Sequence, residues 1–266
     1  MDPARTSSGK EEENLFLKVG RVTDALTAIH TDAQLVILGA SRSNLEQMAK
    51  KRLTANQRRR FGWSLPALIS EKDADYYRAA VLWYLERGFQ IWEVNNWGHL
   101  DLLHQAEAAQ LIAGYRLNVR NSAAIAELAE ARCKWIVLSL EITGGELKQI
   151  GSGRPHAIPV VTLYAWPPLF TSRLHPRLRE EKTFLTPRNE AHFIRRRGEL
   201  ALIYADRPIQ WFEKLGSLRS MGFRHFMIDA SDGPHDEARS FEPLLEGYRS
   251  LRANGPYSLF NFDRNP

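Results

Sequence analysis

Short apolar runs recur along the chain, and the stretches between them have the spacing of amphipathic helices. In the clearest helical stretch, residues 70–88, Tyr77, Val81 and Tyr84 share one face. Apolar runs alternating with helices predict a parallel α/β fold, and the short crossovers favour a closed TIM-like (β/α)8 barrel over an open sheet. The eight runs are LFLKV (15–19), LVILGA (35–40), WSLPALI (63–69), FQIWEV (89–94), YRLNV (115–119), KWIVLSL (134–140), IPVVTLYA (158–165) and RHFMIDA (224–230).

One segment interrupts this alternation after the seventh run. Residues 167–208 contain five prolines and lack an amphipathic helix, whereas AHFIRRRGELALIYA (191–205) alternates like a hairpin. We therefore expect an irregular excursion over 167–208 that ends in a β-hairpin around residues 197–199. The sequence predicts a single barrel domain over 15–266 with this excursion inside it, preceded by a polar, disordered lead-in or linker over 1–14.

The overall composition is that of an average globular chain, with 266 residues, 44% hydrophobic and 25% charged. No apolar run approaches the roughly 18 residues of a membrane span, and the polar start lacks the apolar core of a signal peptide. We expect a cytoplasmic protein with no membrane partner. The single cysteine, Cys133, excludes an internal disulfide and a cysteine-only zinc site, and its place after a helical run predicts a buried, inert thiol.

The formal charge of +5 and the pI of about 9.4 come from 36 basic residues, most of them arginine. Two clusters stand out, Arg58–Arg60 and Arg195–Arg197, and such clusters are typical of RNA-binding surfaces. The alternative is an ordinary arginine-rich surface, because acidic residues are interleaved with the basic ones.

In a parallel barrel, the carboxyl ends of the strands carry the chemistry. The stretch IWEVNNWGHLDLL (91–103) places Asn95 and Asn96 at such an end, just before a predicted helix. The pair is either a turn with an Asn cap or part of a ligand-binding mouth. We expect one Asn to cap the helix and the other to face the mouth, with Gly98 allowing a close approach of the backbone.

Three further residues near the expected mouth are candidates for catalysis. Glu141 and Asp229 could share general acid and base work, and His99 could act as a general base. The alternative is that the carboxylates order loops and His99 caps a helix. The candidate ligand-binding residues are Asn95, Asn96, Asn118, Asn121, Tyr164 and Arg173. The sequence has no HExxH, P-loop or GxSxG motif, and predicts no metal and no cofactor.

Several segments, taken in order, resemble a known family. They are VNNWGHLDLL, YRLNVRNSAAIAEL, IVLSLE, VTLYAWPPLFTSR and FRHFMIDAS, within a match over about residues 15–262. Together they resemble the barrel domain of peptidase family U-32, the collagenase-like peptidases. The resemblance implies a TIM-like barrel and a peptidase that acts on a peptide or protein substrate.

Related proteins in that superfamily act in RNA hydroxylation or quinone biosynthesis and carry an iron–sulfur cluster held by four cysteines. Here Leu174, His175 and Pro176 stand where the family commonly has a cysteine, and one cysteine cannot hold such a cluster. No iron–sulfur cluster is expected.

The leading hypothesis is a peptidase of the collagenase-like family. The alternative is a non-catalytic or RNA-modification-related barrel that binds RNA or a partner subunit through its arginine-rich surface and the 167–208 excursion. A radical or hydroxylation enzyme without a cluster ranks last. Family members often contain two such units in tandem, so the chain is expected either to stand alone or to be one unit of a larger protein or complex.

Overall fold

The computed structural model describes residues 13–103, 106–153, 155–174, 182–197, 199–233, 240–253 and 255–263. Eight parallel strands pair in chain order, and β7 pairs with both β6 and β13, which closes the barrel. The predicted TIM-like barrel is thereby confirmed. The eight strands are β1 (Asn14–Val19), β2 (Leu35–Gly39), β3 (Phe61–Ser64), β4 (Ile91–Val94), β5 (Gln110–Ala113), β6 (Cys133–Val137), β7 (Ile158–Ala165) and β13 (His225–Ala230).

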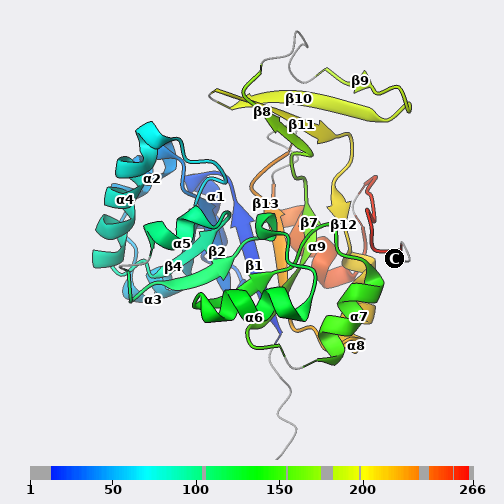
Figure 1. The fold of residues 1–266 in the computed structure, drawn as a ribbon, viewed down its shortest axis with the longest axis horizontal. Helices are drawn as coiled ribbons and strands as arrows, with labels where there is room; N and C mark the ends of the chain where they lie inside the picture. The colour runs from blue at the N-terminus through cyan, green and yellow to red at the C-terminus, as the bar shows by residue number, and fades with distance from the viewer. Residues whose placement is uncertain are drawn as a thin grey trace, which may run out of the picture.

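Helices between the strands surround the barrel (Figure 1). They are α1 (Val22–Ala28), α2 (Arg42–Ala49), α3 (Ala55–Arg59), α4 (Glu71–Glu86), α5 (Gly98–Leu102), α6 (Ser122–Glu130), α7 (Gly144–Ser152), α8 (Leu215–Ser220) and α9 (Glu242–Ser250), with 3-10 turns η1 (Tyr115–Leu117) and η2 (Phe212–Lys214). Each longer helix buries one stripe, as α4 does with Tyr77, Val81 and Tyr84. This stripe is the face that its spacing predicts.

Two separate apolar clusters hold the barrel together. The larger fills the space between the strands and the helices. The smaller lies inside the barrel, where side chains from alternate strand positions meet. We call it the apolar plug, and its members are Phe16, Leu35, Ile37, Ile91, Ile112, Val137, Val160 and Met227. The barrel is therefore closed at this level by packed side chains.

The predicted excursion forms a second sheet that lies over one end of the barrel (Figure 1). Its strands are β8 (Phe170–Ser172), β9 (Phe184–Leu185), β10 (Ala191–Arg197) and β11 (Leu200–Ala205), in the order β8-β11-β10-β9. The predicted hairpin is confirmed, because β10 and β11 are antiparallel and Arg197 pairs with Leu200. We call this four-stranded sheet the roof. The chain then returns through β12 (Ile209–Gln210), which pairs antiparallel with β7.

The fifth predicted strand, YRLNV (115–119), is wrong. The strand is QLIA (110–113), and Tyr115–Leu117 form the 3-10 turn that follows it. Asn118 ends that turn in the left-handed region with φ of 55°, a conformation that asparagine tolerates. Tyr115 and Leu117 are apolar at alternate positions because they pack on the outer core. The alternating apolar residues in YRLNV therefore belong to a 3-10 turn that packs on the core, and not to a strand.

The third predicted strand, WSLPALI (63–69), is displaced. The strand runs from Phe61 to Ser64, and Pro66 lacks the N–H that a continued ladder would require. Residues 65–68 instead form a loop at the carboxyl end of the strand, where they line a cavity.

Three further predictions concern the termini, the thiol and the membrane. Residues 1–12 of the expected lead-in lie outside the described residues, and β1 already begins at Asn14. Cys133 is buried and free, and burial raises the pKa of its thiol to about 12, as expected for an inert cysteine. No helix within the described ranges has the length and hydropathy to cross a bilayer.

Candidate active site

The barrel interior becomes polar two residues beyond the apolar plug, toward the carboxyl ends of the strands. At the next positions along seven of the strands, every residue is polar, charged or glycine. They are Lys18, Gly39, Glu93, Gly114, Ser139, Thr162 and Asp229. Because side chains alternate along a strand with period two, a step of two residues keeps the same face and moves toward the carboxyl end. We call this set the polar layer.

Lys18 lies at the centre of the polar layer. Its Nζ is 2.8 Å from Oε2 of Glu93 and 3.5 Å from Oδ2 of Asp229, so β1, β4 and β13 each contribute one charge. The three side chains expose 7% or less of their surface. Burial alone would lower the pKa of Lys18, but the negative charges of Asp229 and Glu93 outweigh it and raise this pKa. Lys18 is therefore a fixed ammonium ion at neutral pH.

The two carboxylates differ in their other contacts. Oδ1 of Asp229 accepts hydrogen bonds from the backbone N–H of Ser231 at 3.0 Å and from its hydroxyl at 2.5 Å. Oε1 of Glu93 is buried and has no hydrogen-bond partner among the described residues. Gly114 makes room for it, since a Cβ at that position would lie 3.0 Å from Oε1 of Glu93 and 2.2 Å from Oδ1 of Asn95.

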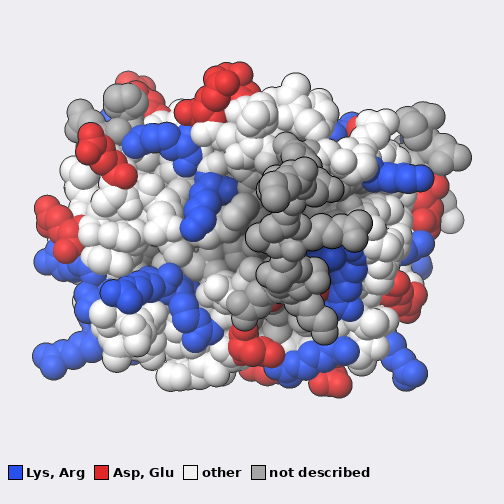
Figure 2. Space-filling view, turned by 90° about the horizontal axis from the view of Figure 1, so that it is seen from below, with Lys and Arg blue, Asp and Glu red and all other residues white. Residues whose placement is uncertain are grey.

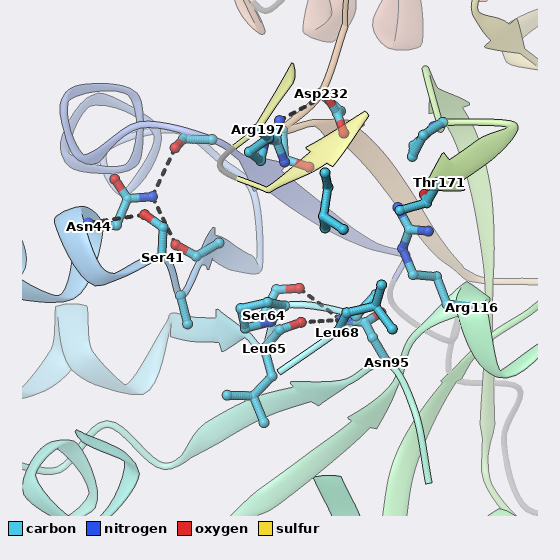
Figure 3. A pocket seen from close by; sticks show the side chains of 18 of the residues that line it. Ser41, Asn44, Ser64, Leu65, Leu68, Asn95, Arg116, Thr171, Arg197 and Asp232 are labelled. Atoms are coloured by element: carbon cyan, nitrogen blue, oxygen red, sulfur yellow. Dashed lines mark hydrogen bonds and ion pairs between the residues drawn. The ribbon is translucent and has the colours of Figure 1, made fainter. Parts of the chain in front are cut away.

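A cavity of about 970 Å³ lies above the polar layer, between the strand ends and the roof (Figure 3). Lys18, Ser64, Asn95 and Tyr115 line it from the barrel. Residues that follow β2, β3 and β13, in loops and in the first turn of α2, also line it, namely Ser41, Arg42, Asn44, Leu65, Leu68, Ser231 and Asp232. The roof contributes Pro168, Thr171, Arg197, Leu200 and Leu202. The ammonium ion of Lys18 thus lies at the base of a half-open cavity large enough for a drug-sized or short-peptide ligand.

Polar contacts tether the roof to the barrel. Nη2 of Arg197 lies 3.0 Å from Oδ1 of Asp232, and the Tyr204 hydroxyl donates to the same oxygen at 2.7 Å. Arg195 donates to the carbonyl of Gly233 at 2.5 Å. On the other side, Lys72 of α4 forms an ion pair with Glu199 at 2.7 Å. The roof therefore closes the cavity through bonds to both β13 and α4.

The two adjacent asparagines both line the cavity but make different contacts, and the residue at the N-cap of α5 is Trp97. Oδ1 of Asn96 accepts the backbone N–H of His99 at 3.2 Å, which is a cap-like contact at the start of α5. Asn95 lines the cavity and donates to the Ser64 hydroxyl at 3.1 Å and to the Leu65 carbonyl at 2.8 Å. Asn95 is 5% exposed, so it also ties β4 to the end of β3.

His99 lies behind these asparagines. Its Nδ1 accepts the backbone N–H of Asn95 at 3.1 Å, which leaves the ring proton on Nε2. Burial lowers the pKa of His99 to about 4, so the ring is neutral at physiological pH. This geometry favours a structural role in which the neutral ring fixes the turn after β4.

The remaining predicted residues lie around the rim. Asn121 caps α6 by accepting the N–H of Ala124 at 2.9 Å, and Asn118 accepts the hydroxyl of Ser139 at 2.6 Å. Tyr164 is buried, and burial raises its pKa to about 12. Glu141 and Arg173 are exposed. Of the nine predicted residues, only Asn95 and Asn96 are among the described residues that line the cavity.

Both arginine clusters are used within the chain. Arg60 donates to the carbonyls of Thr31 and Ala33, and Arg58 donates to the carbonyl of Arg87. Figure 2 shows basic and acidic side chains interspersed over the face opposite the roof. RNA binding through these clusters stays a prediction.

The described residues contain no group of three His, Cys, Asp or Glu side chains arranged to hold a metal ion. The charged residues of the polar layer were not among the sequence candidates, apart from Asp229. The readable signal for Lys18 and Glu93 is a single charge in an otherwise apolar strand, in LFLKV and in IWEV.

Comparison with known proteins finds similarity only among solved structures. No protein-family model matches the sequence, and no curated protein matches it. The fold is similar to that of the U32 peptidase Mk0906, with a TM-score of 0.49 and 11% identity over 88% of this chain and 98% of that one.

Two other enzymes of different kinds also align with the chain. The Bacillus cereus spore cortex-lytic enzyme SleL gives a TM-score of 0.43 and 10% identity over 96% of this chain and 75% of that one. A 2,3-dimethylmalate lyase of the PEP mutase/isocitrate lyase superfamily gives 0.42 and 9% over 90% and 81%.

Proposed function

We propose that the protein is a hydrolase with its active site at the barrel mouth, and that it cleaves peptide bonds. The observation that carries this proposal is the buried Lys18 ammonium, fixed by Glu93 and Asp229 at the base of the cavity. An ammonium ion has three N–H donors. Two face the carboxylates, and the third is available to a substrate carbonyl.

Lys18 would polarise the scissile carbonyl and stabilise the oxyanion that forms on it. Fixed charges in a water-poor site are effective in this role because they need no reorganisation during the reaction. Glu93 and Asp229 keep the ammonium protonated and in place. Because Glu93 is fully buried, we assign it to positioning rather than to contact with substrate.

The attacking water needs a base, and Ser231 connects the cavity to one. The Ser231 hydroxyl lines the cavity and donates to Asp229 at 2.5 Å. As water attacks the carbonyl carbon, one of its protons passes to Ser231 while the Ser231 proton passes to Asp229. The same proton returns to the leaving amine when the C–N bond breaks, so the cycle ends with Asp229 ionised again.

With Asp229 as the general base, the other two catalytic candidates from the sequence, Glu141 and His99, have no part in the proposed reaction. Glu141 is exposed and lies outside the described cavity lining, and the neutral His99 already accepts a backbone hydrogen bond on Nδ1. The sequence resemblance to the collagenase-like peptidases supports the choice of a peptide substrate. The alternative function, binding of RNA or a partner subunit, has no comparable support in the described contacts, since the arginine clusters bond within the chain.

Digestion of a peptide library, read by mass spectrometry, tests the proposal. Lys18→Met and Asp229→Asn should each lower the cleavage rate about 100-fold or more, whereas the exposed controls Lys50→Met and Asp75→Asn should keep it. Ser231→Ala is a third site variant. It removes only a hydroxyl group and no buried charge, so the protein should still fold while cleavage slows. Cleavage that persists unchanged in all three site variants, or wild-type protein that cleaves no library peptide, would contradict the proposal.

A further inference from the structure

The cavity wall contains one cation, Arg116, that makes no direct ion pair with a carboxylate of the described residues, although Asp229, Asp232 and Glu93 attract it from farther away. Four basic residues line the cavity, and three of them are paired. Lys18 contacts Glu93, Arg42 contacts Asp73 at 2.5 Å, and Arg197 contacts Asp232 at 3.0 Å. The fourth, Arg116, forms no ion pair with any described residue.

Arg116 is held by an aromatic ring in place of a carboxylate. Its guanidinium carbon lies 5.4 Å from the centre of the Tyr115 ring, and Nζ of Lys18 lies 5.5 Å from the centre of the same ring. Cations at such distances are attracted to the face of a ring. Burial raises the pKa of Tyr115 to about 12, so its phenol is neutral at physiological pH and neutralises neither cation.

Arg116 is also placed where a ligand would pass. It belongs to η1, the turn that follows β5, and Figure 3 shows it beneath Thr171 of the roof. A ligand whose carbonyl contacts Lys18 can therefore reach Arg116 with a group a few atoms away. A guanidinium fork matches the two oxygens of a carboxylate, which it binds with paired, charge-assisted hydrogen bonds.

We propose that Arg116 binds a carboxylate of the substrate close to the bond that reacts at Lys18, so that the site selects acidic peptides. This inference rests on the proposed peptide hydrolysis for the identity of the ligand. The carboxylate can come from the carboxyl terminus of a peptide or from an acidic side chain. Both sources present the same group to the guanidinium.

Four short peptides separate the two sources. Acetyl-Gly-Ala with a free carboxyl terminus is compared with its amide, and the amide of acetyl-Gly-Glu is compared with the amide of acetyl-Gly-Gln. Binding to the wild-type protein, to Arg116→Gln and to Arg78→Gln is measured by calorimetry. Arg78 is an exposed residue of α4 that pairs with Asp75, so Arg78→Gln is matched for the loss of one charge.

At least one peptide with a carboxylate should bind more tightly than its neutral partner, and Arg116→Gln should weaken that binding by about tenfold or more. Arg78→Gln should leave it unchanged. The inference is overturned if acidic and neutral peptides bind alike, if Arg116→Gln binds as the wild type does, or if none of the four binds at millimolar concentration.

The same peptides distinguish this inference from the proposed function. If the acidic peptides bind through Arg116 but no peptide is hydrolysed, selection of carboxylates stands and the peptidase proposal fails. If the acidic peptides are cleaved equally well by wild type and Arg116→Gln, and no faster than their neutral partners, hydrolysis stands and the role of Arg116 fails.

Discussion

The apolar plug and the polar layer occupy the same barrel, on the same strands, two residues apart. Phe16, Ile91 and Met227 form part of a dry interior, whereas the next inward positions on those strands are Lys18, Glu93 and Asp229. Both levels lie within the same three strands, β1, β4 and β13, and they differ in the polarity of their side chains. The plug supplies stability through packing, and the polar layer places charges where the barrel opens into the cavity.

The largest expected effect comes from removing the central charge of the polar layer. Lys18→Met should lower the free energy of unfolding by about 3–5 kcal/mol, because it leaves two buried carboxylates without their cation. Combining it with Glu93→Leu and Asp229→Leu should restore stability to within about 1 kcal/mol of wild type, or above it, since an apolar cluster replaces a buried ion group at little cost.

Urea unfolding followed by circular dichroism measures both variants. If the triple variant is less stable than Lys18→Met, the polar layer itself stabilises the fold. The division of roles between the apolar plug and the polar layer would then be wrong. Recovery of stability would show that this layer is polar for a reason other than folding.

A second effect depends on pH and concerns His99, which lies behind the turn after β4 and outside both levels. Burial lowers the pKa of His99 from 6.5 to about 4, so the unfolded chain takes up a proton at a higher pH than the folded one. The contribution of His99 to stability is therefore complete above about pH 6.5 and is lost as the pH falls to about 4. The loss amounts to about 3 kcal/mol.

Unfolding free energies of wild type and His99→Asn, measured between pH 7 and pH 4, test this expectation. The wild-type curve should fall more steeply than that of His99→Asn, whereas His30→Asn, which changes an exposed histidine, should follow the wild type. Parallel curves for wild type and His99→Asn would rule out a buried neutral imidazole.

The smallest effect concerns the turn between β4 and α5. Asn96→Ala removes the cap-like bond to His99 and should cost about 0.5–2 kcal/mol. Asn95→Ala should cost at least as much, because it removes two buried hydrogen bonds to the end of β3. Thermal unfolding of the two variants decides the order.

The periodic features of the fold could be predicted from the sequence, and the features set by tertiary contact could not. Alternation of apolar runs and helical stretches predicts the barrel, because each strand is buried on both faces. The fifth strand was missed because QLIA is short and weakly apolar, while the next turn, at Tyr115 and Leu117, packs on the core and imitates a strand.

The site was predictable only in part for a related reason. Searching strand ends finds Asn95 and Asn96 but overlooks charges within strands, and so misses Lys18 and Glu93. A charged residue at an inward strand position is a sign of a partner elsewhere in the chain, and the sequence does not say which one. The residues next to Arg116 in the sequence do not mark it as a ligand-binding residue. What distinguishes it is the lack of a direct ion pair with any described residue, and only the folded structure shows this.

The roof joins the barrel at two neighbouring points, since Ala165 and Ile209 are ladder partners of β7 and β12. The ends of the inserted segment therefore lie about 5 Å apart, and its entry and exit need not move if its length or sequence changes. Insertions that begin and end at adjacent points are well tolerated, because they add little loop-closure cost to the parent fold. The barrel and its roof can thus vary as separate modules, so that one barrel mouth can be covered by different roofs.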